Sequence, residues 1–227
     1  MPATDTVAGE RREDPHVTEQ NAWARMVEQD PEHSSRYAER FRAMRAAGDD
    51  LAGEARMVDA MVPRASRILD AGCGPGRVGG WLHGVGHTVV GVDLDGVLIA
   101  AAEQDHPGPR WLVGDLAELD LPERGIAEPF DVIVCAGNVV AFLAPSSRVP
   151  VLERLREHLA VGGRLVIGFG TGRDYAFETF LDDAASAGLR HDVLLSSWHL
   201  HPFDDRATFL VAILVADRDR HEDRAVR

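Results

Sequence analysis

Lysine is absent from this 227-residue sequence, so all 24 of its lysine-or-arginine positions are arginine, which we attribute to compositional bias. Only two cysteines are present and neither has metal-ligand spacing, which argues against a disulfide framework and predicts no metal site. No apolar run is long enough to cross a bilayer, and the first fifteen residues lack the apolar segment of a secretory signal. We therefore expect a cytoplasmic protein without membrane contact. A net charge of −13 without a basic cluster argues against a nucleic-acid partner.

The most informative segment is a glycine turn directly after a short apolar strand. Ile68 and Leu69 supply the predicted strand, and Asp70 follows them near its tip. Glycine permits backbone angles and a closeness of approach that a Cβ would forbid. The turn glycines are Gly72, Gly74 and Gly76. A helix is predicted immediately afterwards, so the segment is typical of a loop that binds a cofactor.

Two kinds of ligand fit this loop. The stretch from Gly74 to Gly79 matches the dinucleotide spacing G-x-G-x-x-G, with Asp93 close to the expected distance beyond it. However, the apolar strand does not run up to Gly74, and Asp70 would repel a pyrophosphate. The same carboxylate would attract a cationic ligand. An adenosyl sulfonium amino acid is such a ligand, so the electrostatics favour it over a dinucleotide.

Together with three downstream segments, the loop resembles the class I S-adenosylmethionine-dependent methyltransferases. The downstream segments are 88–93, 111–116 and 130–138, each a predicted strand whose end carries a polar or small residue. They follow one another at about twenty residues, as βα units require. The match covers roughly residues 50 to 216. It implies a Rossmann-like, doubly wound α/β fold with a mostly parallel seven-stranded sheet, a C-terminal antiparallel hairpin and an N-terminal helical extension.

The resemblance also implies S-adenosylmethionine as the cofactor and assigns residues to it. Asp93 would accept hydrogen bonds from both ribose hydroxyls, and Asp115 would receive the adenine amino group. Leu94 and Leu116 would belong to the same part of the site, and Ala136 would border the methyl group. The glycine loop completes the predicted site with Asp70, Gly72, Cys73, Gly74 and Gly76.

Simpler structural roles stay open for several of these residues. Asp93 could serve as the acid at the start of the helix from Gly96 to Asp105, a role that Asp95 could fill equally well. Asp115 could be an ordinary turn acid. Cys73 and Cys135 could simply be small buried residues, the commonest fate of a free cysteine.

The N-terminal region predicts a helix that covers the cleft. Residues 34–47 have helical periodicity, with Tyr37 and Phe41 on one stripe, and a second helix is expected to continue to Val62. In the family that the chain resembles, such a helix lies across the cofactor, and its Tyr or Arg can hold the methionine carboxylate. Tyr37 and Arg40 are the candidates, against the simpler interpretation of an amphipathic surface helix.

The C-terminal region predicts a strand over 192–198 and another over 207–216, joined as a hairpin. If the sixth strand runs parallel to the others, its exit lies at the ligand-binding edge of the sheet. His199 and His201 are therefore candidate catalytic bases, with Trp198 and Asn138 near the acceptor, although exposed loop histidines are an equally simple interpretation.

These patterns divide the chain into four expected parts. We predict a disordered segment over 1–20, a helical lid over 21–62, the cofactor-binding domain over 63–216 and a mobile tail over 217–227. The predicted activity is methyl transfer from S-adenosylmethionine to an O, N or S atom of a small molecule. An NAD-dependent oxidoreductase using the same loop and a non-catalytic adenosyl-ligand-binding protein are the alternatives.

Overall fold

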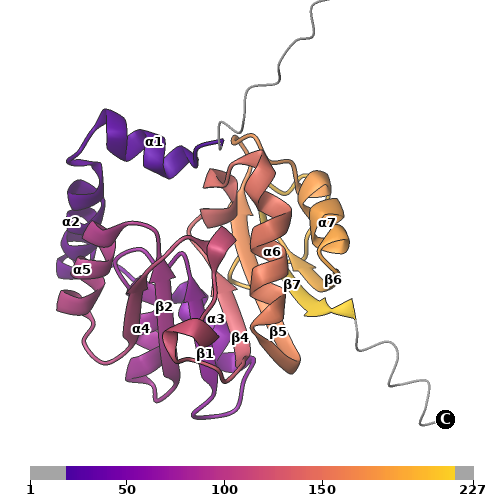
Figure 1. Ribbon diagram of the computed structural model, residues 1–227, viewed down its shortest axis with the longest axis horizontal. Helices are drawn as coiled ribbons and strands as arrows, with labels where there is room; N and C mark the ends of the chain where they lie inside the picture. The colour runs from indigo at the N-terminus through magenta and orange to yellow at the C-terminus, as the bar shows by residue number, and fades with distance from the viewer. Residues whose placement is uncertain (1–18, 218–227) are drawn as a thin grey trace, which may run out of the picture.

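The computed structural model describes residues 19–217, so the segments predicted as disordered and mobile lie outside it except at Glu19, Gln20 and Asp217. It contains one sheet with the strand order β3-β2-β1-β4-β5-β7-β6 (Figure 1). The strands are β1 (Arg67–Ala71), β2 (Thr88–Asp93), β3 (Arg110–Val113), β4 (Phe130–Cys135), β5 (Leu159–Gly170), β6 (Leu189–Leu195) and β7 (Phe209–Ala216).

The sheet is parallel from β3 to β5, and β7 runs antiparallel between β5 and β6. This arrangement confirms the predicted Rossmann-like α/β fold with a C-terminal antiparallel hairpin. The strand order reverses between β1 and β4, and ligands of open α/β sheets bind at the carboxyl ends of the strands beside such a reversal.

Helices cover both faces of the sheet. α3 and α4 pack on one face and α6 and α7 on the other, while α2 lies beside α5 and α1 crosses above the strand ends (Figure 1). The α-helices are α1 (Ala22–Gln29), α2 (His33–Ala46), α3 (Gly53–Ala60), α4 (Arg77–Gly84), α5 (Gly96–Asp105), α6 (Arg148–Glu157) and α7 (Phe177–Ser186). Four short 3-10 helices are η1 (Leu116–Glu118), η2 (Pro122–Arg124), η3 (Val139–Phe142) and η4 (Pro145–Ser147).

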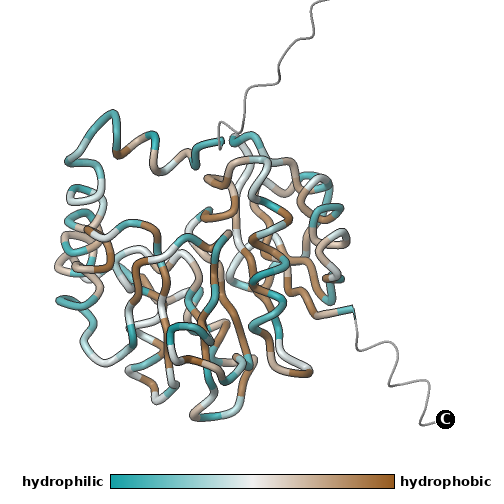
Figure 2. Tube along the Cα trace, in the orientation of Figure 1, coloured by the Kyte–Doolittle hydropathy of each residue, from teal (hydrophilic) through white to brown (hydrophobic). Residues whose placement is uncertain are grey.

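Both faces of the central strands are buried, and the strands are accordingly hydrophobic along their length (Figure 2). Successive residues of β1 illustrate this, because Ile68 packs toward α3 and α4 while Leu69 packs toward α6. The consequence is a sheet held firmly on both sides, whose strand tips are fixed relative to one another.

Two elements differ from the sequence-based expectation. α1 was not predicted as a helix; it begins after Asn21, whose side-chain oxygen accepts a hydrogen bond from the backbone N–H of Trp23 at 2.8 Å. β6 spans 189–195 instead of 192–198, because Leu189 and Arg190 already pair with β7. Trp198 therefore lies in the loop beyond the strand.

Gly91, in the middle of β2, packs so closely against Trp111 that a larger residue there should destabilise the protein. A Cβ at this position would lie 2.2 Å from ring carbons of Trp111. Gly91→Ala should therefore lower the free energy of unfolding by about 1–3 kcal/mol, measured by chemical denaturation. Gly84→Ala in α4 is the control, since its added Cβ would meet no described atom within 4 Å, and it should be neutral or slightly stabilising. An equal loss in both variants would refute the packing explanation.

Candidate functional site

The turn after β1 folds tightly because glycines occupy its strained positions. Gly72 and Gly76 have φ angles of 75° and 80°, in the left-handed region that side chains rarely adopt. A Cβ on Gly72 would lie 2.4 Å from Val139, and one on Gly76 would lie 2.8 Å from Ala102. Both glycines thus allow close packing behind the loop. Gly74 differs, because the nearest atom to an added Cβ would be 3.9 Å away on the Tyr37 ring.

Asp70 anchors the amino end of α4 to β1. Its side chain is buried, and Oδ2 accepts a hydrogen bond from the backbone N–H of Gly79 at 2.7 Å. Burial raises the pKa of Asp70 to about 7, although the Gly79 hydrogen bond opposes that shift. A nearby positive charge would stabilise the ionised form of this buried carboxyl group, because the attraction would offset the loss of hydration on burial.

Asp93, at the tip of the neighbouring strand β2, joins the glycine loop to the start of α5. Oδ2 accepts the backbone N–H of Gly74 at 2.8 Å, and Oδ1 accepts the backbone N–H of Asp95 at 2.9 Å. Burial raises the pKa of Asp93 to about 6. Asp95, not Asp93, caps α5, because its side chain accepts hydrogen bonds from the backbone N–H groups of Val97 and Leu98.

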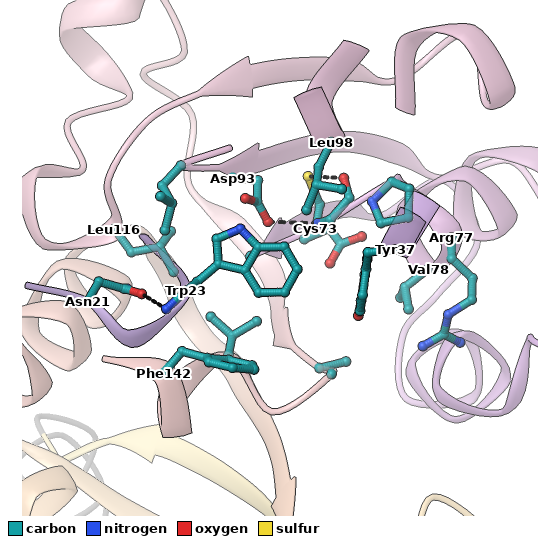
Figure 3. Close-up of a pocket in the computed structure, with 18 of the residues that line it drawn as sticks. Asn21, Trp23, Tyr37, Cys73, Arg77, Val78, Asp93, Leu98, Leu116 and Phe142 are labelled. Carbon is teal, nitrogen blue, oxygen red and sulfur yellow. Dashed lines mark hydrogen bonds between the residues drawn. The ribbon is translucent and has the colours of Figure 1, made fainter. Parts of the chain in front are cut away.

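A cleft of about 860 Å³, including its open mouth, lies over these strand tips. Most of the predicted cofactor residues line it, namely Asp70, Gly72, Cys73, Gly74, Asp93, Leu94, Asp115, Leu116, Ala136 and Tyr37. Figure 3 shows the Trp23 indole in the middle of this region, with Asp93 on one side and Phe142 on the other. The cleft is therefore bounded by the loop and strand tips below and by α1 and α2 above.

Sequence reasoning missed about half of the lining. The additional lining residues are Asn21, Trp23, Phe41, Pro75, Arg77, Val78, Leu98, Gly114, Gly137, Val139, Phe142 and Leu143. The aromatic members touch edge to face, with ring centroids 5.1 Å apart for Trp23 and Tyr37 and 5.7 Å apart for Trp23 and Phe142. Asn21 as a helix N-cap is the one sequence signal that could have identified α1.

Arg77 is the cationic residue of the lining, and its charge is already paired. Its guanidinium forms a two-pronged ion pair with Glu54, with N–O distances of 2.7 and 2.5 Å, and also donates to the carbonyl of Leu51. The unpaired charge in the cleft is consequently acidic, contributed by Asp70, Asp93 and Asp115.

The two predicted anchors on α2 have different positions. Tyr37 lines the cleft, and burial raises the pKa of its hydroxyl. Arg40 is exposed and does not belong to the lining; its guanidinium lies over the rings of Tyr37 and Phe41, 4.8 and 5.2 Å from their centroids.

Asp115 has the predicted turn role, since its Oδ1 accepts the backbone N–H of Ala117 at 2.8 Å and caps η1. It also lines the cleft, so the adenine contact stays a prediction.

Cys73 and Cys135 are free and buried, and burial raises the pKa of both thiols. Both are thus neutral thiols at physiological pH, and only Cys73 reaches the cleft.

The predicted acceptor residues lie outside the lining. His199 and His201 are exposed in the loop between β6 and β7, and Trp198 packs over Gly168 of β5. The side-chain oxygen of Asn138 accepts the backbone N–H of Gly170 at 2.8 Å, which ties the tip of β4 to the end of β5. A general-base role for either histidine would require this loop to approach the cleft, and it stays a prediction.

Within residues 19–217, no group of three or more His, Cys, Asp or Glu side chains is arranged to hold a metal ion. In the same range, no helix combines the length and the apolar character needed to cross a membrane.

The fold and the acidic, glycine-lined cleft are typical of α/β proteins that bind a ligand at the strand reversal. A model of the methyltransferase domain matches residues 68–163. A solved structure, a TehB-like SAM-dependent methyltransferase from Corynebacterium glutamicum, is 49% identical in sequence and has a TM-score of 0.77. It covers 82% of this chain, and the match covers 100% of its own chain. The chain therefore belongs to the S-adenosylmethionine-dependent methyltransferases, and S-adenosylmethionine is its cofactor.

Two curated relatives match over shorter segments. Malonyl-acyl-carrier-protein O-methyltransferase of Pectobacterium atrosepticum is 35% identical over 66 residues, which are 28% of this chain and 26% of that protein. Trans-aconitate 2-methyltransferase of Delftia acidovorans is 30% identical over 125 residues, which are 54% of this chain and 45% of that protein. The chain thus matches less than half the length of either relative.

Proposed function

We propose that this protein transfers the methyl group of S-adenosylmethionine to an O, N or S atom of a small molecule. The observation that carries the proposal is the cleft, which combines buried carboxyl groups at two adjacent strand tips with an aromatic wall. We further propose that residues 63–216 form the catalytic domain and that residues 21–62 cover it. In that part, α1 and α2 supply lining residues, whereas α3 packs against the sheet.

The residues present fit the cofactor. Asp93 is placed to accept ribose hydroxyls, and Gly74 leaves room beside the loop, since the nearest atom to an added Cβ would be on the Tyr37 ring, 3.9 Å away. Leu94 and Leu116 supply apolar surface for a base on either side, with Asp115 close by. The acidic balance of the cleft suits a sulfonium. When bound, S-adenosylmethionine supplies a methyl group that is already activated by its positively charged sulfur.

The same contacts argue against the dinucleotide alternative. A pyrophosphate would need free backbone N–H groups at the glycine loop and at the amino end of α4. In this chain Asp93 takes the N–H of Gly74, and Asp70 takes that of Gly79. Two carboxyl groups thus occupy two of these donors, and their charge would repel phosphate.

The protein's contribution to the reaction is alignment and exclusion of water. The rings of Trp23, Tyr37 and Phe142 are placed to cover an acceptor and to keep water from the methyl group. Tyr37 carries a buried hydroxyl whose raised pKa keeps it protonated, so it can donate a hydrogen bond to an acceptor oxygen. A small acceptor agrees with the name of one curated relative, trans-aconitate 2-methyltransferase.

Turnover with defined acceptors tests this proposal. The purified protein is incubated with S-adenosylmethionine and a panel of small carboxylic acids, amines and thiols, and S-adenosylhomocysteine is quantified by mass spectrometry. We expect acceptor-dependent product from at least one class. Tight binding of S-adenosylhomocysteine without acceptor-dependent product from any class would instead support the non-catalytic alternative.

The same assay tests the proposed bases. If His199 or His201 removes a proton from the acceptor, the corresponding alanine variant should lose about 10²- to 10⁴-fold in methyl-transfer rate while it binds S-adenosylhomocysteine as wild type does. Unaltered turnover in both alanine variants would exclude the two histidines as bases and leave the cofactor site unaffected.

A further inference from the structure

The lid helices are joined to the cofactor site through one carboxyl group, that of Asp95. Its Oδ2 accepts the indole N–H of Trp23 in α1 at 2.8 Å and the hydroxyl of Ser34 in α2. These partners lie 72 and 61 residues away in the sequence. Asp95 and both partners are buried, with Ser34 fully inaccessible. Two separate lid helices therefore converge on a single oxygen atom.

The rest of Asp95 faces the cofactor site. Its Oδ1 accepts the backbone N–H groups of Val97 and Leu98 at the start of α5, at 2.9 and 3.4 Å. Its own backbone N–H donates to Oδ1 of Asp93 at 2.9 Å. One residue thus connects the lid, the start of α5 and the acid predicted to hold the ribose.

Helix capping alone does not explain this arrangement. A cap requires only the contacts of Oδ1 with the first turn of α5. The contacts of Oδ2 serve the lid instead, because a buried indole N–H and a buried hydroxyl each need an acceptor. Trp23 is also a cleft residue, and its ring touches Tyr37 and Phe142 on the two sides of the cleft (Figure 3).

We propose that Asp95 is a positioning residue that holds the α1–α2 lid over the bound cofactor through Trp23 and Ser34. The inference rests on the proposed cofactor site and adds a coupling to it. Cofactor bound to Asp93 would hold the backbone between Asp93 and Asp95 in place. The side chain of Asp95 would then hold α1 and α2 through its hydrogen bonds from Trp23 and Ser34. By the reciprocity of linked equilibria, a closed lid strengthens cofactor binding as much as bound cofactor favours the closed lid. Because the lid covers the cofactor, it must also open before the cofactor can leave.

Ser34→Ala tests the coupling, because it removes one lid donor and leaves the cap of α5 intact. Ser35→Ala is the matched control on the same helix, since Ser35 is exposed. We expect Ser34→Ala to release S-adenosylhomocysteine about tenfold faster than wild type in stopped-flow experiments, the scale of one lost hydrogen bond. Hydrogen exchange in residues 22–46 should slow on ligand binding in wild type and in Ser35→Ala, and much less in Ser34→Ala.

Trp23→Phe provides a second variant in case Ser34→Ala folds poorly, because it keeps an aromatic ring while it removes the N–H donor together with part of the buried indole. It should also release the ligand faster than wild type. Unchanged release from both variants, with normal binding by wild type, would overturn the coupling alone. Failure of the wild-type protein to bind S-adenosylhomocysteine would overturn the cofactor site and the coupling together.

Discussion

Asp93→Ala should weaken cofactor binding by about 2–4 kcal/mol, which is roughly 30- to 1000-fold in Kd, while the protein stays folded. Asp93 is buried at the tip of β2, and its carboxyl group faces the cleft next to Gly74. Two ribose hydroxyls bonded to it would form charge-assisted hydrogen bonds, each worth about 1.5–3 kcal/mol and not strictly additive. Titration calorimetry with S-adenosylhomocysteine measures the loss directly.

Two further variants make this result specific. Asp93→Asn keeps one acceptor oxygen and should give an intermediate loss. Asp182→Ala, an exposed acid of α7, has the same change in charge and should bind as wild type does. If Asp93→Ala binds the ligand with wild-type affinity, Asp93 serves only to connect the glycine loop to α5.

The affinity for S-adenosylmethionine should rise about ten- to a hundredfold between pH 5.5 and pH 8. In the unliganded protein burial raises the pKa of Asp70 to about 7 and that of Asp93 to about 6. A cationic sulfonium favours the ionised carboxylates, so binding releases protons below these values. Each released proton changes the affinity by up to about tenfold per pH unit.

S-adenosylhomocysteine separates the charge effect from other titrations, because it lacks the transferable methyl group and with it the sulfonium charge, while the adenosine and amino-acid parts are the same. Its affinity should rise less with pH, and Asp70→Asn, which keeps an acceptor for Gly79, should flatten the rise for S-adenosylmethionine. Equal pH dependence for the two ligands would contradict the electrostatic role of these acids.

The same pKa shifts act on stability with the opposite sign. Unfolded aspartate titrates near 4, so between about pH 4 and pH 7 the folded protein binds more protons than the unfolded chain at Asp70 and Asp93. Their contribution to the free energy of unfolding is therefore fully present below about pH 4, falls progressively as pH rises through this range, and is completely lost above pH 6 to 7. Bound S-adenosylmethionine should stabilise the protein most in the range where this contribution has been lost.

The sequence predicted the fold and the glycine loop because both depend on local rules. Short apolar segments at regular spacing define parallel strands, and the tips of β1 and β2 must then meet at one edge. This is why Asp70, Gly74 and Asp93, far apart in the sequence, could be expected together, and the structure does bring them together.

The lid was only partly predictable, because tertiary contacts determine its position. The periodicity of α2 indicated a helix with Tyr37 inward, but nothing local shows that Trp23 donates to Asp95 across 72 residues. The pairing of Arg77 with Glu54 is equally non-local, although it decides that the cleft is acidic. Such contacts follow from packing, which a single sequence does not reveal.

The start of β6 was misplaced for a related reason. Its first residues include Arg190, His191 and Asp192, a polar run that hides the strand pattern. The strand nevertheless begins at Leu189 because its backbone pairs with β7, and the register shifts between His191 and Val193. Backbone pairing thus overrides side-chain polarity here. The correction moves Trp198 out of the strand and into the following loop, where the two predicted histidines also lie.

Calorimetric titration of the wild-type protein at pH 8 with S-adenosylhomocysteine, and separately with NAD, tests the central claim most directly. Our account predicts one binding site per chain for S-adenosylhomocysteine in the micromolar range, a rise in melting temperature on binding, and no heat with NAD. Binding of NAD without binding of S-adenosylhomocysteine would contradict the account, because the loop would then hold a pyrophosphate in spite of its two carboxyl groups.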